Sequence, residues 1–469
     1  MDFLTDSVTD LAGAVRSGEV SAKELVGHAL DRIDALNPRI NAFVALDAEG
    51  ALAAAAAVDD RRARGEEVGA LAGIPIGVKD LEDAAGLPTT HGSVALPVVE
   101  RAGADSALVA RLRQAGAIVV GKTNTPELGW APQTFNPRFG TTRNPWDLSR
   151  TPGGSSGGSA AAIASGMVPL ATGSDGGGSL RIPSALCGLS GFKPSLGRVP
   201  SGGNEPPDWP LISTKGTMAW RVADLAASLD TVIGPEASDL GSLPTPEASW
   251  LRAVDEPGVP LRVVWSPNLG YGLVDTEVAD LCRAAVDCLA DLGAEVIERT
   301  DVFEADPVLD WLTLASSYLG RSLASVRGTP AWDQVTPDLR GMIEAWGGGS
   351  AVDLVKAEDA CHALNLRLVS LFHHARLLIC PTVAGRAPVC GAQGTINAEE
   401  NVGWVAFTYP FNMTRSPAGT VCVGRASDGM PVGLQLVGPQ HGDLVVLRAM
   451  AALEASLRFS ARPELASPG

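Results

Sequence analysis

The chain has 469 residues, a length that fits one very large domain or two lobes that share a sheet. Apolar residues make up 45% and charged residues 19% of the chain, which is a globular composition and excludes intrinsic disorder. The formal net charge of −17 is repelled by phosphate backbones, so we expect no nucleic acid among the partners.

Targeting and redox signals are sparse. The seven cysteines are odd in number and scattered without a CxxC pair, which excludes a disulfide framework or zinc site and favours a reducing compartment. The first residues are acidic, without the basic start of a signal peptide, and no apolar stretch reaches about 18 residues. We therefore expect a soluble cytoplasmic protein that contacts no membrane.

The N-terminal part begins with helices and continues with buried strands. Helical spacing of apolar residues over 9–36 predicts two amphipathic helices, and residues 51–64 form an alanine-rich helix. The β-branched runs at 74–80 and 117–123 read as buried strands on either side of a helix at 106–116. This strand–helix–strand order predicts a parallel or mixed sheet in an α/β fold.

The alternation of predicted strands and helices returns after residue 260. An acidic stretch with Pro and Ser at 234–260 is typical of a surface connection. Helical patterns then fill 278–293 and 306–375. Further short apolar runs predict strands at the following positions: 261–265, 294–298, 376–382 and 429–438.

Two motifs have a formal match but the wrong context. Residues 116–123 fit the phosphate-loop pattern, yet 117–120 are themselves the strand, so their amides belong to a sheet ladder instead of a phosphate cradle. Residues 153–157 fit the nucleophile-elbow spacing, but turn formers precede them where a strand is needed. His373 and His374 lie at a predicted helix end, so a Ser-His-Asp triad is disfavoured.

A third pattern combines two Ser/Gly segments with a lysine. Lys79 follows a buried strand, where burial would lower the pKa of its ammonium and leave a neutral amine able to act as a base. In the loop at 175–179, three consecutive glycines let several backbone N–H groups point to one spot beside Ser179. Such donors form an oxyanion hole for acyl transfer. A single glycine-rich segment could equally be a turn without a function. The lysine and both segments together favour a catalytic site.

These segments resemble the amidase signature family. The block at 153–200 carries the most specific similarity, and shorter similarities occur at 73–80, 86–93, 121–130 and 431–439. The resemblance therefore extends over nearly the whole chain.

The resemblance implies a role for each member of a Ser-Ser-Lys triad. Lys79 is implied as the base, Ser155 as the proton relay that follows a cis peptide bond, and Ser179 as the residue that is acylated. Asp175 and Arg181 are expected to pair and brace the loop. The oxyanion donors are the backbone amides of Gly176, Gly177, Gly178 and Ser179.

The resemblance also implies the fold and the reaction. The expected fold is a large mixed β-sheet flanked by α-helices, in one amidase domain over 1–469. Its expected parts are N-terminal helices (1–65), a catalytic core (66–230) and the remaining sheet with pocket helices (231–469). The expected reaction is hydrolysis of an amide C–N bond without metal or cofactor. We also expect the protein to be a monomer or a homodimer. The texture of the signature block is similar to the branch of aryl acylamidases, oligoamide hydrolases and urethanases.

The substrate pocket is less well defined by the sequence. Aromatic residues in the candidate pocket segments favour a bulky apolar amide, oligoamide or carbamate, although aromatic residues occur more often in cores than in pockets. These residues are Trp130, Phe135, Trp209, Trp311, Trp346, Phe407 and Tyr409. Gly176 stands where many members have a side chain, and we expect it to loosen the loop. Arg415 and Cys422 also depart from the family pattern. We expect these two departures to affect the shape of the pocket and not the mechanism.

Two other functions stay open. The amidase component of a tRNA-dependent amidotransferase shares this core, although Ile182 stands where that component usually has Gln. A non-catalytic protein on the same fold is the other alternative, and it would be expected with a broken triad.

Overall fold

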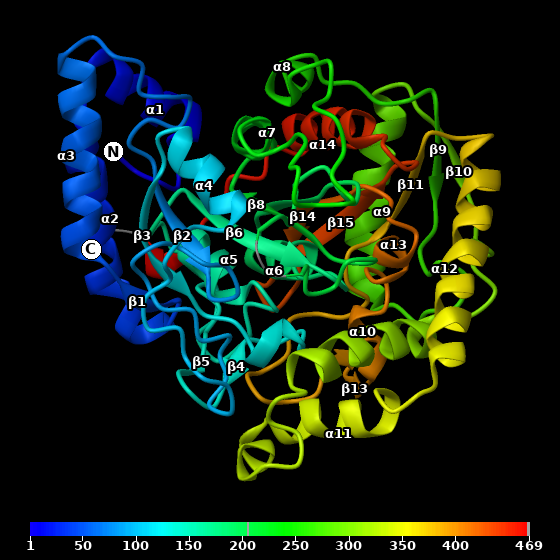
Figure 1. The fold of residues 1–469 in the computed structure, drawn as a ribbon. Helices are drawn as coiled ribbons and strands as arrows, with labels where there is room; N and C mark the ends of the chain where they lie inside the picture. Colours follow the sequence, from blue (N-terminus) through cyan, green and yellow to red (C-terminus); the bar gives the residue numbers. More distant parts are fainter. Residues whose placement is uncertain (204–205, 467–469) are drawn as a thin grey trace.

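A mixed β-sheet forms the centre of the computed structural model, which describes residues 1–203 and 206–466 (Figure 1). Eleven strands of the described chain make up this sheet, with parallel and antiparallel neighbours. In sheet order they are β1 (Phe43–Leu46), β3 (Ile118–Thr123), β2 (Pro75–Lys79), β6 (Leu170–Asp175), β8 (Thr214–Ala219), β7 (Ser190–Lys193), β14 (Ala418–Arg425), β15 (Pro431–Val437), β11 (Leu377–Pro381), β9 (Arg262–Trp265) and β10 (Glu295–Glu298). The predicted fold class is confirmed.

Helices cover the sheet, and Figure 1 shows α3 at one flank of the molecule and α12 at the opposite flank. The helices are α1 (Val8–Ser17), α2 (Ala22–Ile40), α3 (Ala48–Ala63), α4 (Ala107–Gln114), α5 (Gly157–Ala164), α6 (Arg181–Cys187), α7 (Val222–Asp230), α8 (Trp250–Val254), α9 (Thr276–Asp291), α10 (Val308–Ser322), α11 (Pro337–Trp346), α12 (Ala351–Phe372), α13 (Pro410–Met413) and α14 (Asp443–Leu457). Within the described ranges, none of them combines the length and apolar character needed to cross a membrane.

Short elements complete the chain. Two small antiparallel pairs lie outside the main sheet: β4 (Phe135–Asn136) with β5 (Gly140–Thr141), and β12 (Thr395–Ile396) with β13 (Glu399–Glu400). The 3-10 helices are η1 (Glu127–Gly129), η2 (Pro330–Gln334), η3 (Val402–Val405) and η4 (Glu464–Ala466).

Local sequence explains the N-terminal helices. Ser7 caps α1, which ends at Gly18 in a left-handed conformation with φ of 80°. Ser21 and Glu24 then form a capping box that starts α2. The predicted break between two helices is therefore produced by one glycine and one serine cap.

The strands that position the site are fully buried. Every residue of β2 and β3 is buried, and β2 lies between β3 and β6 in parallel register. The run that matched the phosphate-loop pattern is thus largely strand β3, as expected from its β-branched residues. His373 caps the C-terminus of α12, which agrees with its predicted place at a helix end.

One connection is more ordered than expected. The stretch at 234–260 contains the short helix α8, and Trp250 at its start is buried. Its ring packs edge-on against Phe192 of β7, with ring centroids 5.9 Å apart. Burial of this large aromatic ring is the physical reason why part of the segment is not a surface connection.

Candidate active site

Lys79 is the last residue of β2, and its side chain is entirely buried. Its Nζ donates hydrogen bonds to Ser155 Oγ at 2.7 Å and to Ser174 Oγ at 3.0 Å. Burial disfavours the charged ammonium and lowers the pKa of Lys79 to about 7, against the opposing charges of Glu82 and Asp175. The amine is therefore substantially neutral near pH 7, and it contacts a serine hydroxyl.

Ser155 lies in the turn that leads into α5. The peptide bond between Gly154 and Ser155 is cis, as the family resemblance implies. The backbone here is closely packed, because a Cβ at Gly154 would lie 2.6 Å from the carbonyl oxygen of Ala131. Further along, all eight residues of α5 are buried, and a Cβ at Gly158 would lie 2.3 Å from the backbone nitrogen of Asn124. Small residues therefore let α5 pass close to the chain that follows β3.

The loop that contains Ser179 connects β6 to α6. Asp175 ends β6 and Arg181 begins α6, and the two side chains form the predicted pair. Arg181 Nη2 donates to Asp175 Oδ1 at 2.8 Å, and Nε donates to Oδ2 at 2.9 Å. Burial raises the pKa of Asp175, but Arg181, Lys193 and Asn412 together outweigh burial and lower the pKa to about 2. The carboxylate stays ionised and fixes both ends of the loop.

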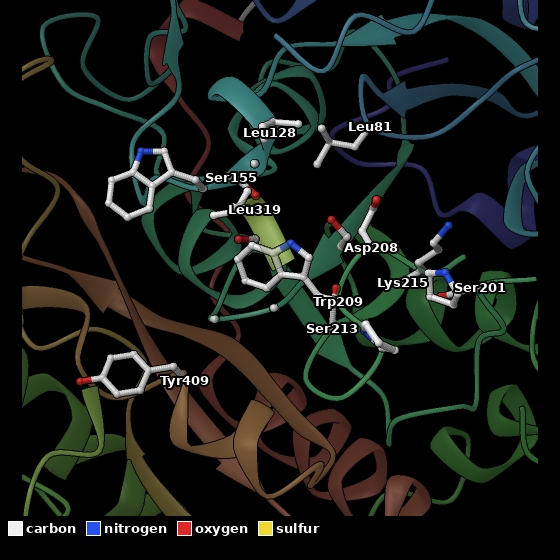
Figure 2. A pocket seen from close by; sticks show the side chains of 18 of the residues that line it. Leu81, Leu128, Ser155, Ser201, Asp208, Trp209, Ser213, Lys215, Leu319 and Tyr409 are labelled. Atoms are coloured by element: carbon white, nitrogen blue, oxygen red, sulfur yellow. The ribbon is translucent and has the colours of Figure 1, made fainter. Parts of the chain in front are cut away.

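Ser155 and Ser179 line the same cavity, which has a volume of about 1010 Å³. Within the described chain their side chains are not hydrogen-bonded to each other, so the continuous part of the predicted relay is Lys79 to Ser155. Figure 2 shows Trp209 and Tyr409 among the side chains of this cavity, together with Ser155. Hydroxyls and aromatic rings thus line one cavity.

Four of the seven predicted pocket aromatics line the cavity, namely Trp130, Trp209, Trp311 and Tyr409. The prediction is wrong for the other three. Phe407 is fully buried and packs against Tyr271 with ring centroids 6.2 Å apart. Phe135 is 50% exposed in β4, and Trp346 is 37% exposed at the end of α11. Phe407 therefore belongs to the core, and Phe135 and Trp346 lie at the outer surface.

The expectation that Gly176 loosens the loop is also wrong. A Cβ at Gly176 would lie 2.6 Å from the ring of Trp209, so this indole fills the space that a side chain would need. A Cβ at Gly177 would lie 2.5 Å from the ring of Trp311. The two tryptophans pack directly on the loop and limit it to glycine. Arg415 and Cys422 do not line the cavity.

Several polar residues of the site were missed by the sequence analysis. Glu82 and Lys215 both line the cavity and form an ion pair of 2.8 Å. Asn412 Nδ2 donates to the backbone oxygen of Asp175 at 2.7 Å, and Arg181 Nη2 donates to Asn412 Oδ1 at 2.7 Å. The position of Glu82, close after Lys79, was the one signal available for it, whereas Asn412 lies 237 residues from Asp175.

A family model described as Amidase matches residues 24–447. The chain belongs to the amidase family. This amidase is 37% identical over 464 residues to an acylamidase of Rhodococcus erythropolis, with 96% of this chain and 95% of that protein covered. It is also 37% identical over 489 residues to a glutamyl-tRNA(Gln) amidotransferase component of Salinispora arenicola, with 97% of this chain and 98% of that protein covered.

Solved structures show the same architecture. A bacterial aryl acylamidase of the amidase signature family superposes with a TM-score of 0.92 and 29% identity, covering 98% of both chains. The 6-aminohexanoate cyclic dimer hydrolase complexed with substrate gives a TM-score of 0.88 and 31% identity over 100% of both chains. The amidase described here is therefore an enzyme that hydrolyses amide carbon–nitrogen bonds.

The Asp175–Arg181 pair should be essential for stability. Arg181→Met leaves a buried carboxylate without its cation, and we expect a loss of about 3–5 kcal/mol in the free energy of unfolding. The matched control is Arg262→Met, because Arg262 pairs with Glu295 at the surface, where such pairs contribute about 0–1 kcal/mol. Denaturant titration of both variants tests this, and an Arg181→Met loss no larger than that of Arg262→Met would contradict it.

Proposed function

We propose that this amidase hydrolyses a bulky apolar substrate (an aryl amide, an oligoamide or a carbamate) through an acyl-enzyme on Ser179. The observation that carries the proposal is the 2.7 Å contact between Lys79 Nζ and Ser155 Oγ at the wall of the cavity that Ser179 also lines. A buried amine with a pKa of about 7 beside a hydroxyl is suited to general base catalysis.

In the acylation step, neutral Lys79 takes the proton of Ser155 while Ser155 takes the proton of Ser179. Ser179 Oγ then attacks the amide carbonyl carbon, and the carbonyl oxygen becomes an oxyanion that accepts hydrogen bonds from the loop amides at 176–179. As the C–N bond breaks, Ser155 returns a proton to the leaving nitrogen and Lys79 reprotonates Ser155. The free amine leaves, and Ser179 remains as an ester of the acyl group.

Deacylation uses the same proton path, with water in place of Ser179 as the nucleophile. A water molecule attacks the ester carbon while its proton passes through Ser155 to Lys79. When the tetrahedral intermediate collapses, Ser179 leaves and regains a proton through Ser155. The carboxylic acid is released, and Lys79 is neutral again. These steps need the chain's own groups and one water molecule.

The cavity supports the proposed substrate class. Its volume of about 1010 Å³ lies at the upper end of small-molecule sites, and aromatic rings make up part of its wall. The Trp311 and Tyr409 rings are stacked with centroids 5.4 Å apart, and Trp209 lies 6.4 Å from Trp311. Similarity to an acylamidase, and to structures of an aryl acylamidase and an oligoamide hydrolase, points to the same class.

The amidase component of a tRNA-dependent amidotransferase is the second candidate, because glutamyl-tRNA(Gln) amidotransferase subunits A from several organisms match 94–99% of this chain. In that role the chain would release ammonia to a partner protein. Ile182 lines the cavity at the position where that component usually has Gln, which favours the hydrolase. Efficient hydrolysis by the isolated chain would separate the two functions. We further propose a monomer or homodimer in the cytoplasm, consistent with seven free cysteines, that binds neither nucleic acid nor membrane.

The nucleophile is tested by Ser179→Ala in a screen of anilides, oligoamides, carbamates and primary amides. We expect the wild type to hydrolyse at least one bulky class and to be labelled at Ser179 by a fluorophosphonate probe. The Ser179→Ala protein should lose both labelling and turnover, because no acyl-enzyme can form. Turnover by Ser179→Ala close to that of the wild type would refute the assignment.

The base is tested by the pH dependence of kcat/KM. Because the neutral amine is the active form, kcat/KM should rise with pH, reach half its plateau near pH 7 and fall as Lys79 is protonated at lower pH. The charge of Glu82 raises the pKa of Lys79, so Glu82→Gln should move the profile to lower pH. Glu295→Gln, at an exposed pair outside the cavity lining, serves as the control and should leave the profile in place. A shift of the Glu82→Gln profile to higher pH would contradict this role.

A further inference from the structure

The loop at 175–179 is held from outside through its carbonyl oxygens. Four successive carbonyls of this loop each accept a hydrogen bond, two from the segment at 408–412, one from α10, and one from α6, which directly follows the loop. The donors are Asn412 Nδ2 to Asp175 at 2.7 Å, Trp311 Nε1 to Gly176 at 2.9 Å, Thr408 Oγ1 to Gly177 at 2.6 Å, and the backbone N–H of Ile182 to Gly178 at 2.7 Å.

Each of these bonds also fixes the direction of an N–H group. In a trans peptide unit the C=O and the following N–H point in opposite directions, and the peptide units of this loop are trans. The four held carbonyls therefore orient the N–H groups of residues 176–179, which are the proposed oxyanion donors. Among the described residues, none of these four N–H groups donates a hydrogen bond within the chain, and Gly176, Gly177 and Ser179 line the cavity.

Two of the donors touch the loop closely enough to leave it little freedom. A Cβ at Gly177 would lie 2.5 Å from the ring of Trp311, and a Cβ at Gly178 would lie 2.4 Å from Thr408 Oγ1. Gly178 also has a φ of 139°, a backbone conformation that residues with a side chain rarely adopt. The glycines thus allow Trp311 and Thr408 to reach the backbone directly.

Trp311 and Thr408 are themselves fixed in place. The Trp311 ring stacks on Tyr409, and the Tyr409 hydroxyl donates a hydrogen bond to Asp306. The backbone oxygen of Thr408 accepts a hydrogen bond from Arg181 Nη1 at 2.9 Å. Both donors therefore belong to a rigid support, which an oxyanion hole needs if its dipoles are not to reorganise during the reaction.

We propose that Trp311 and Thr408 are positioning residues of the oxyanion hole, acting through the Gly176 and Gly177 carbonyls on the N–H groups of Gly177 and Gly178. This inference rests on the proposed acylation of Ser179. It predicts that loss of either hydrogen bond weakens the transition state more than the bound substrate, because the developing oxyanion needs the aligned donors most.

Substitutions that remove the donor and keep the shape test the proposal. Trp311→Phe keeps a ring but loses the indole N–H, and Thr408→Val keeps the branched shape but loses the hydroxyl. We expect each to lower kcat about 10- to 100-fold, with KM changed less than about threefold. Affinity for a trifluoromethyl ketone, which forms a tetrahedral adduct with a serine, should fall in parallel with kcat. Thr408→Ser should recover most of the lost kcat, since it restores the donor.

The controls separate failure of this inference from failure of the proposed function. Trp346→Phe changes a tryptophan outside the cavity lining and should leave kcat unchanged. Trp311→Phe and Thr408→Val with kcat within twofold of the wild type would overturn the positioning role, provided that Ser179→Ala is inactive. An active Ser179→Ala would instead overturn the proposed function. If Trp311→Phe does not fold, the Thr408→Val and Thr408→Ser pair decides the matter.

Discussion

The hydrogen bond between Lys79 Nζ and Ser155 Oγ is the interaction on which the site depends. It joins a serine hydroxyl to an amine that burial makes a usable base near neutral pH, because water no longer stabilises the charge of the ammonium. Lys79 is kept in the interior because its strand, β2, is hydrogen-bonded between β3 and β6. A lysine on an exposed strand would keep its charge and could not accept a proton.

The second half of the site depends on ionic and polar contacts between distant segments. Arg181 links Asp175, Asn412, Gln435 and the backbone of Thr408, so it joins the glycine loop to β15 and to the segment before α13. Because all these groups are buried and hydrogen-bonded, the loop is rigid although it consists largely of glycine. The glycines allow neighbouring side chains to contact the loop backbone closely, and they do not make the loop mobile.

Local patterns predicted much of the fold and the chemical residues. Strands β2 and β3 and the two N-terminal helices α1 and α2 follow from short stretches of sequence, whereas the pairing of Asp175 with Arg181 was expected from the family resemblance. Contacts made across long separations could not be found in this way. Trp311 and Thr408 lie 135 and 231 residues from the carbonyls that they hold. For the same reason, composition alone could not separate cavity rings from core or surface rings.

The protonation state of Lys79 is the most direct test of its role as the base. Titration of the protein with ¹³C-labelled lysine, followed by NMR and assigned with Lys79→Met, measures the pKa of this one amine. We expect a pKa of about 7 for Lys79 in the folded enzyme. A measured pKa of about 10.4, the ordinary value for lysine, would contradict this role, because the amine would then be charged near pH 7 and unable to act as a base.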